Sequence, residues 1–158
     1  MKYLARMAQG GRIFVVRLRP DADLLPALRD IAQKEDLKAG VILSAAGLLR
    51  KAHLRNCKSF PKEYPITDAN RAFIVLEKPL EILGLSGIIY TVKGAQEVHA
   101  HATLSYVEDG EVKVVGGHLL DGCIVFGFAE IVIMELAKID MEKRFDSETK
   151  TLQLFVEE

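Results

Sequence analysis

Three of the four histidines in this 158-residue chain lie in one segment, residues 97–120, whose pattern predicts a β-hairpin. Asp109-Gly110 at its centre is a pair typical of a two-residue type I′ turn. Counting outward from that turn along both strands places His101 directly opposite His118. His99 lies on the same face, because side chains in a strand alternate with a period of two.

These three side chains have the chemistry and the spacing of a metal site. Facing residues of a hairpin have Cβ atoms about 4.5–5.5 Å apart, and imidazole nitrogens bind zinc at about 2.0–2.1 Å. We therefore expect His99, His101 and His118 to hold a tetrahedral ion, Zn²⁺ in the first place, with its fourth position open to a small-molecule ligand. The plainer alternative is three surface or hydrogen-bonded histidines, because a His-x-His pair alone is a weak signal.

One helix is predicted beside the strands, over about residues 23–37. Asp23 is the expected N-cap, and Gly40 is the expected stop signal. An apolar stripe at helical spacing follows the cap, formed by Leu24, Leu28, Ile31 and Ala32. This stripe should cover one face of a sheet.

Most of the remaining chain predicts strands. The predicted ranges are 12–19, 41–44, 48–55, 71–76, 81–90, the two hairpin arms, 124–136, 141–145 and 150–156. Residues 45–47 are expected to form a turn or bulge between two strands, the second of which has an exposed edge. Residues 59–71 contain two prolines and predict a loop.

Glu130 interrupts the apolar run of residues 124–136. If even-numbered residues share one face, Glu130 lies beside Phe128 and Val132. A buried carboxylate without a partner is costly, so we expect an arginine, a subunit contact or a protonated carboxyl group there.

Composition and charge restrict the classes of protein. The length fits one domain, expected over residues 9–158 after a short N-terminal extension, residues 1–8. A net charge of −1 gives no global basic field to attract nucleic acid or an anionic membrane. The densest basic cluster, which is expected to be a solvated face, consists of Arg50, Lys51, Arg55, Lys58 and Lys62. His53 lies in the same predicted strand and is expected to be exposed.

Several features argue for a cytoplasmic protein with free thiols. The chain has only two cysteines and no Cys-x-x-Cys, and its N-terminus lacks the apolar core of a signal peptide. The longest apolar stretch before Glu130 is too short to cross a membrane. No dinucleotide or phosphate-binding glycine loop and no Gly-x-Ser-x-Gly elbow occurs.

Over residues 9–136 the chain resembles the plants-and-prokaryotes-conserved (PPC) domain, in its stand-alone prokaryotic form. The motifs that carry the resemblance are Gly11-Arg12-Ile13-Phe14, Ser44-Ala45-Ala46-Gly47, Glu81-Ile82-Leu83-Gly84-Leu85-Ser86-Gly87, His99-Ala100-His101, Gly116-Gly117-His118-Leu119 and Ala129-Glu130-Ile131-Val132-Ile133. The resemblance implies an α/β (α+β) fold, with a mostly antiparallel sheet, one main covering helix and assembly as a homotrimer. It also implies a histidine-bound metal, carried over to His99, His101 and His118.

The family's plant members follow AT-hook motifs in DNA-binding proteins, and two departures separate this chain from them. It has no Arg-Gly-Arg-Pro core, and the plant segment Gly-Arg-Phe-Glu-Ile-Leu is here Lys78-Pro79-Leu80-Glu81-Ile82-Leu83. We therefore expect no specific DNA binding.

The leading interpretation is a trimeric, zinc-binding protein whose biological role the sequence does not state. One alternative is a metal-dependent hydrolase or lyase, because an open zinc position lowers the pKa of bound water to about 7. Thr103 shares the expected face, and Glu81 and Glu97 are the nearest candidate bases. The other alternative is a DNA-associated regulatory protein that uses the basic cluster of three subunits.

Overall fold

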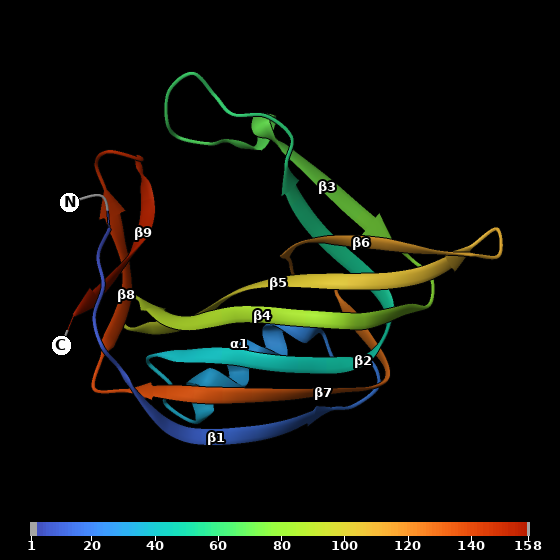
Figure 1. The fold of residues 1–158 in the computed structure, drawn as a ribbon, viewed down its shortest axis with the longest axis horizontal. Helices are drawn as coiled ribbons and strands as arrows, with labels where there is room; N and C mark the ends of the chain where they lie inside the picture. Colours follow the sequence, from blue (N-terminus) through green and yellow to red (C-terminus); the bar gives the residue numbers. More distant parts are fainter. Residues whose placement is uncertain (1–2, 158) are drawn as a thin grey trace.

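The computed structural model describes residues 3–157, which form nine strands, one α-helix and one short 3-10 helix (Figure 1). In chain order the elements are β1 (Gln9–Leu18), α1 (Leu24–Lys34), β2 (Gly40–Cys57), η1 (Asp68–Asn70), β3 (Arg71–Leu76), β4 (Leu80–Val92), β5 (Ala95–Glu108), β6 (Glu111–Leu119), β7 (Ile124–Ala137), β8 (Asp140–Asp146) and β9 (Thr151–Glu157). A mostly antiparallel sheet with a single α-helix against it confirms the expected fold class.

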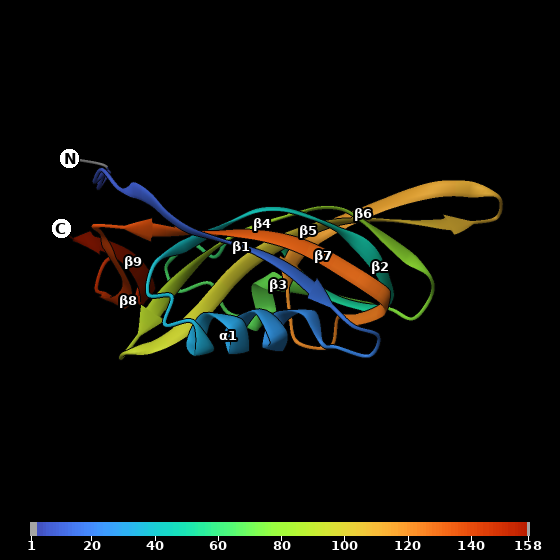
Figure 2. The ribbon, with the colours of Figure 1, turned by 90° about the horizontal axis from the view of Figure 1, so that it is seen from below.

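The strands form one sheet in the order β1-β7-β2-β6-β5-β4-β8-β9, with β3 beside β2. Within residues 3–157 every strand pairing is antiparallel except a single contact between Thr91 of β4 and Glu142 of β8. β2 organises the sheet, because its first half pairs with β4 and β7 and its second half pairs with β3 and β6. Figure 2 shows α1 lying against one face of this sheet.

The core lies between α1 and that face. Leu24 and Leu28 of the helix are fully buried. The strands contribute every second residue, as the sequence pattern predicted: on β1, Leu18 is buried, whereas Ile13 and Val15 are exposed on the opposite face. The stripe of the helix therefore packs as expected.

The helix begins where the sequence predicted but ends earlier, at Lys34. Asp23 is the N-cap residue, yet its side chain makes no capping hydrogen bond; it accepts one from the backbone N–H of Gly122 at 2.7 Å instead. Asp36 adopts a left-handed φ of 49°, which ends the helical geometry before the expected residue 37. Gly40 is thus the first residue of β2 and does not terminate the helix.

For residues 45–47 the sequence predicted a turn or a bulge; the turn is wrong, and the structure has the register shifts of a bulged strand. These small residues lie inside β2, which continues for 18 residues and shifts its register against β7 on both sides of them. Small residues favour turns in a sequence pattern, but they also permit a bulged strand. The expected exposed edge at 48–55 is also wrong, because neighbours flank that part of β2 on both sides.

Glu130 is exposed, so the expected burial of its carboxylate is wrong. The even-numbered face of β7 is its outer face, where Phe126 and Phe128 are 62% and 41% exposed, whereas Ile131 lies in the core. Arg17 of β1 faces Glu130 in the register. A subunit contact at Glu130 stays a prediction.

The C-terminal hairpin β8–β9 follows the predicted strands closely and, among the residues that the structure describes, pairs with the rest of the sheet through β4 alone. At the other end, residues 3–8 precede β1 without regular structure. Within residues 3–157 there is no helix of the length and apolar character that crossing a membrane would need.

Candidate metal centre

The β5–β6 hairpin has the register that the sequence predicted. Asp109 and Gly110 form the turn with φ angles of 53° and 77°, the two positive values that a type I′ turn requires. Along the two strands, His101 then faces His118. His99 lies two residues before His101 on the same strand.

The three imidazoles converge on one point of this face. The Nε2 atoms of His99 and His101 are 3.1 Å apart, and the ring of His118 lies 4.8 Å from that of His99, centroid to centroid. One nitrogen from each residue lies within 4.8 Å of the others. Two nitrogen ligands of a tetrahedral zinc ion are about 3.3 Å apart, so a small side-chain adjustment would complete a three-nitrogen site. The residues present therefore fit the ion.

Burial keeps two of these histidines neutral. Loss of solvent lowers the pKa of His118 from 6.5 to about 4, and the positive charges of Arg55 and Lys143 act in the same direction. The pKa of His99 is lowered by the same desolvation, then by Lys143. Because a metal binds the unprotonated imidazole, the surroundings favour the ligating form at neutral pH.

The backbone under the site is tightly packed at Gly87 of β4. A Cβ atom added there would lie 2.4 Å from the carbonyl oxygen of His99 and 2.8 Å from the Cα of Ala100. Gly84 of the same strand has no atom within 4 Å of its corresponding position. Glycine at position 87 thus permits the close approach of the strand that carries His99 and His101.

A hollow of about 500 Å³ opens beside His118, between β5, β2, α1 and β8. Arg55 of β2 faces His118 directly across the sheet. The lining residues are Leu25, Arg29, His53, Arg55, Tyr90, Glu97, Val98, His118, Leu119, Leu120, Asp121 and Lys143. The histidine cluster therefore lies at the edge of a polar, open space.

The two candidate bases have different positions. Glu97 lines the hollow, but its carboxylate is engaged by Arg29, with Nε to Oε2 at 2.9 Å. Glu81 pairs with Ser105, away from the histidines along β5, and the structure does not bring it to the site. Thr103 is the next exposed residue after His101 on the face that the hairpin predicted.

His53 is not the exposed strand residue that the sequence predicted. It is partly buried, lines the hollow, and its Nδ1 lies 3.0 Å from the carbonyl oxygen of Asp121. It does not belong to the three-nitrogen cluster.

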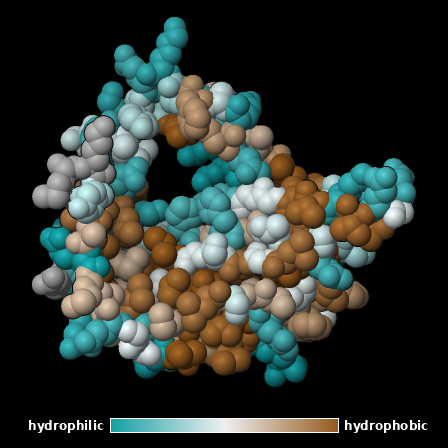
Figure 3. Space-filling model, viewed as in Figure 1, coloured by the Kyte–Doolittle hydropathy of each residue, from teal (hydrophilic) through white to brown (hydrophobic). Residues whose placement is uncertain are grey.

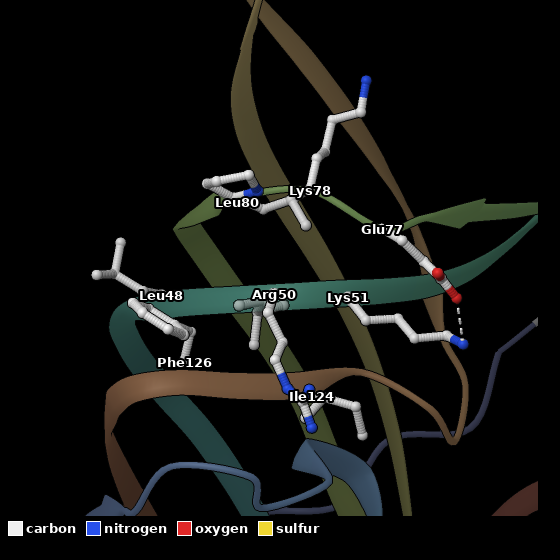
Figure 4. A pocket seen from close by; sticks show the side chains of 10 residues that line it. Leu48, Arg50, Lys51, Glu77, Lys78, Leu80, Ile124 and Phe126 are labelled. Atoms are coloured by element: carbon white, nitrogen blue, oxygen red, sulfur yellow. Dashed lines mark hydrogen bonds and ion pairs between the residues drawn. The ribbon is translucent and has the colours of Figure 1, made fainter.

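The largest cavity described, about 750 Å³, lies elsewhere, between β2, the β3–β4 turn and the start of β7 (Figure 4). Leu48, Leu80 and Phe126 give it an apolar lining. Figure 4 shows Lys51 joined to Glu77, at 2.7 Å. No histidine or cysteine lines this cavity, so its chemistry does not suggest a metal site.

Three members of the basic cluster lie at these two cavities, whereas Lys58 and Lys62 line neither and are exposed, as expected. Arg50 and Lys51 lie at the larger cavity and pair with Asp21 and Glu77. Arg55 is partly buried in the histidine hollow, so the expectation of one solvated face is wrong for this residue.

Sequence reasoning missed Arg55 and Lys143 as neighbours of the site. Arg55 reaches it because the end of β2 pairs with the end of β6, a long-range pairing with no local signal. Lys143 comes from β8, which within residues 3–157 is joined to the strands before it by a single bridge to β4. The alternation of side chains along a strand predicts on which face Arg55 and Lys143 lie. It does not predict which strands become neighbours, so it could not place these residues beside His118.

Comparisons with known proteins agree with this architecture. The model of the Plants and Prokaryotes Conserved (PCC) domain matches residues 5–137. The bifunctional protein GlmU of Synechococcus sp. (strain JA-3-3Ab) is 33% identical over 146 residues, which are 92% of this chain and 21% of that protein. The chain thus spans about a fifth of the length of this curated relative.

Two solved structures share the fold. A metal-containing protein from Archaeoglobus fulgidus is 26% identical, with a TM-score of 0.77 over 97% of this chain and 99% of that one. A plant- and prokaryote-conserved (PPC) protein from Pyrococcus horikoshii is 25% identical, with a TM-score of 0.75 over 95% and 96% of the two chains.

Proposed function

This chain belongs to the Plants and Prokaryotes Conserved (PCC) domain family, and we propose that it binds one zinc ion through His99, His101 and His118. The convergence of three imidazole nitrogens within 4.8 Å of one another carries the proposal. The metal-containing relative from A. fulgidus supports it, because it shares the fold over nearly its whole length.

The donor set favours zinc over harder cations. Three neutral imidazoles suit zinc, whereas magnesium and calcium prefer the oxygen ligands that this cluster does not offer. The metal would supply a Lewis-acidic position open to a further ligand. The hairpin's part is to hold the three rings on one face, and burial keeps His99 and His118 unprotonated.

Zinc titration of the metal-free protein, followed by calorimetry, tests the proposal. We expect one tight zinc site per chain. His101→Ala should lower the zinc affinity by ~100-fold or more, because losing a ligand costs more than the 10–100-fold loss that follows when only a ligand's hydrogen-bonding partner is removed. His53→Ala is the matched control, because His53 lies in the same hollow but outside the cluster. Equal zinc affinity in wild type and His101→Ala would contradict the proposal.

We also infer that the protein assembles as a homotrimer through the sheet face opposite α1. Apolar residues gather on this face (Figure 3), and among the exposed ones are Ile13, Val15, Leu43, Leu83 and Phe128. An exposed apolar surface of this kind is typical of an interface. Covering it would also place Glu130 at or near a subunit contact.

Light scattering tests the assembly. We expect about three times the chain mass of 17.5 kDa, and Phe128→Asp should reduce it. Phe60→Asp is the control, because Phe60 is 85% exposed but lies in the loop before β3. A monomeric wild-type protein at micromolar concentration would refute the trimer.

A further inference from the structure

We infer that the hollow beside the histidines binds a small molecule through a phosphate or carboxylate group, which Arg55 and Lys143 hold next to the metal's open position. This inference rests on the proposed zinc site, since it assigns the class of ligand that the same site would take.

Of the three cationic side chains that line the hollow, Arg29, Arg55 and Lys143, only Arg29 forms ion pairs within the described residues. Arg29 is neutralised twice, by Glu97 at 2.9 Å and by Asp121 at 2.8 Å. These two carboxylates are the only acidic groups among the lining residues. Arg55 and Lys143 make no ion pair with any carboxylate in residues 3–157. The hollow therefore holds two cations that form no direct ion pair within the described residues.

Both cations are partly withdrawn from water, which makes their lack of a partner costly. Desolvation lowers the pKa of Lys143; the charge of Glu97 opposes this, and the charge of Arg55 lowers the pKa further. Desolvation is also the main cause that lowers the pKa of Arg55, with Arg71 second. Partly buried like charges are unfavourable in isolation. An anion bound between Arg55 and Lys143 would offset the free-energy cost of their desolvation and of their mutual repulsion.

The geometry directs such an anion toward the histidines. Arg55 faces His118 across the β2–β6 pairing, and the charge of Lys143 acts on both His99 and His118. The ammonium group of Lys143 also lies 4.4 Å from the ring centroid of Tyr90, which fixes its position at the rim. A guanidinium, an ammonium and a metal ion around one space are a common arrangement for phosphate or carboxylate.

The size of the hollow limits the rest of the ligand. About 500 Å³ accommodates a small metabolite and not a polymer. Leu25, Val98 and Leu119 form an apolar part of its wall, and all three are buried. The ligand should therefore combine one charged group with a short, less polar body.

Binding of inorganic phosphate and of acetate, measured by calorimetry at low ionic strength, tests the inference. The protein is loaded with zinc and desalted first, and metal content is measured for every variant. We expect Arg55→Gln and Lys143→Gln to keep their zinc and to weaken anion binding by ~10- to 100-fold each, the range for one hydrogen bond to a charged group. Lys51→Gln is the matched control, since Lys51 lies on the same strand as Arg55 but pairs with Glu77 at the other cavity. Circular dichroism verifies that each variant is folded.

The outcomes separate this inference from the zinc proposal. Tighter binding of phosphate than of acetate assigns a phosphorylated ligand, and the reverse order assigns a carboxylate. A zinc-loaded wild type that binds neither anion, or that binds them equally well without Arg55 and Lys143, overturns the inference and leaves the zinc site intact. If zinc does not bind, the zinc proposal fails and the same anion titrations are made on the metal-free protein. Anion binding that depends on Arg55 and Lys143 then supports the inference. No such anion binding overturns the inference as well.

Discussion

The apolar-lined cavity at the β3–β4 turn and the hollow beside His118 differ in whether their charged side chains form ion pairs. In the larger one, Lys51 is paired with Glu77, and Arg50 is paired with Asp21. In the smaller one, Arg55 and Lys143 form no ion pair within the described chain, and His118 of the three-histidine cluster is part of the lining. Volume alone would favour the larger cavity as the functional one. Unsatisfied charge and convergent ligands favour the smaller one, because they indicate a partner from outside the chain.

The largest expected effect comes from the backbone beside the histidine site, which has no counterpart at the larger cavity's lining residues. Gly87→Ala should destabilise the protein by about 1–3 kcal/mol, because the new Cβ would collide with the strand carrying His99 and His101. It should also weaken zinc binding. Urea unfolding and zinc titration measure both effects.

Gly84→Ala is the matched control for that substitution, on the same strand and with open space at its Cβ. We expect its stability to stay within about 0.5 kcal/mol of wild type. Equal stabilities of the two variants would show that close packing at Gly87 does not position the site.

The next effect is a pH dependence specific to the histidine region. The pKa of His118 is about 4 in the folded, metal-free protein, below the ordinary 6.5 expected when the chain is unfolded. Between these values the unfolded state binds more protons, so stability should fall as the pH falls from about 6.5 toward 4. Urea unfolding of metal-free protein at pH 7 and pH 5 measures this loss. His118→Gln should reduce the dependence, and an unchanged slope in that variant would refute the assignment.

A smaller change should follow removal of one cation beside the histidines. Lys143→Gln should raise the pKa of His118 in the metal-free protein, because the charge of Lys143 contributes to lowering it. The shift should be modest, since desolvation and Arg55 are the larger causes. NMR titration of the histidine ring protons measures it. Lys51→Gln, at the other cavity, should leave the titration unchanged, and a shift there as large as that of Lys143→Gln would break the contrast.

The smallest effect concerns nucleic acid. Arg50 and Lys51 are paired with carboxylates at the larger cavity, and Arg55 lies in the histidine hollow, so the members of the basic cluster do not form one continuous basic surface. We expect dissociation constants for duplex DNA no tighter than the usual non-specific range of about 10⁻⁴–10⁻⁶ M. Binding across a salt series checks this. A sequence-selective, nanomolar complex at physiological salt would contradict it.

Local signals in the sequence were enough to predict the hairpin and its register. The Asp109-Gly110 turn and strand alternation together place His99, His101 and His118 on one face, and the structure has the same arrangement. The apolar stripe and Asp23 likewise located the start of α1.

Features that depend on long-range pairing were not predictable in this way. β2 runs without interruption through residues 45–47 because β7 pairs with that stretch. Arg55 reaches His118 only through the β2–β6 pairing, and Glu130 is exposed because the other face of β7 packs on the core. Each outcome depends on which strands become neighbours, which local periodicity does not determine.

Zinc-soaked crystals, with anomalous diffraction recorded on both sides of the zinc absorption edge, test the central claim most directly. We expect one strong peak per chain, about 2.0–2.1 Å from a nitrogen of each of His99, His101 and His118. Crystals of the His53→Ala variant should show the same peak. Crystals without a peak at these three residues, or with zinc bound at His53 instead, would contradict the assignment of the metal centre.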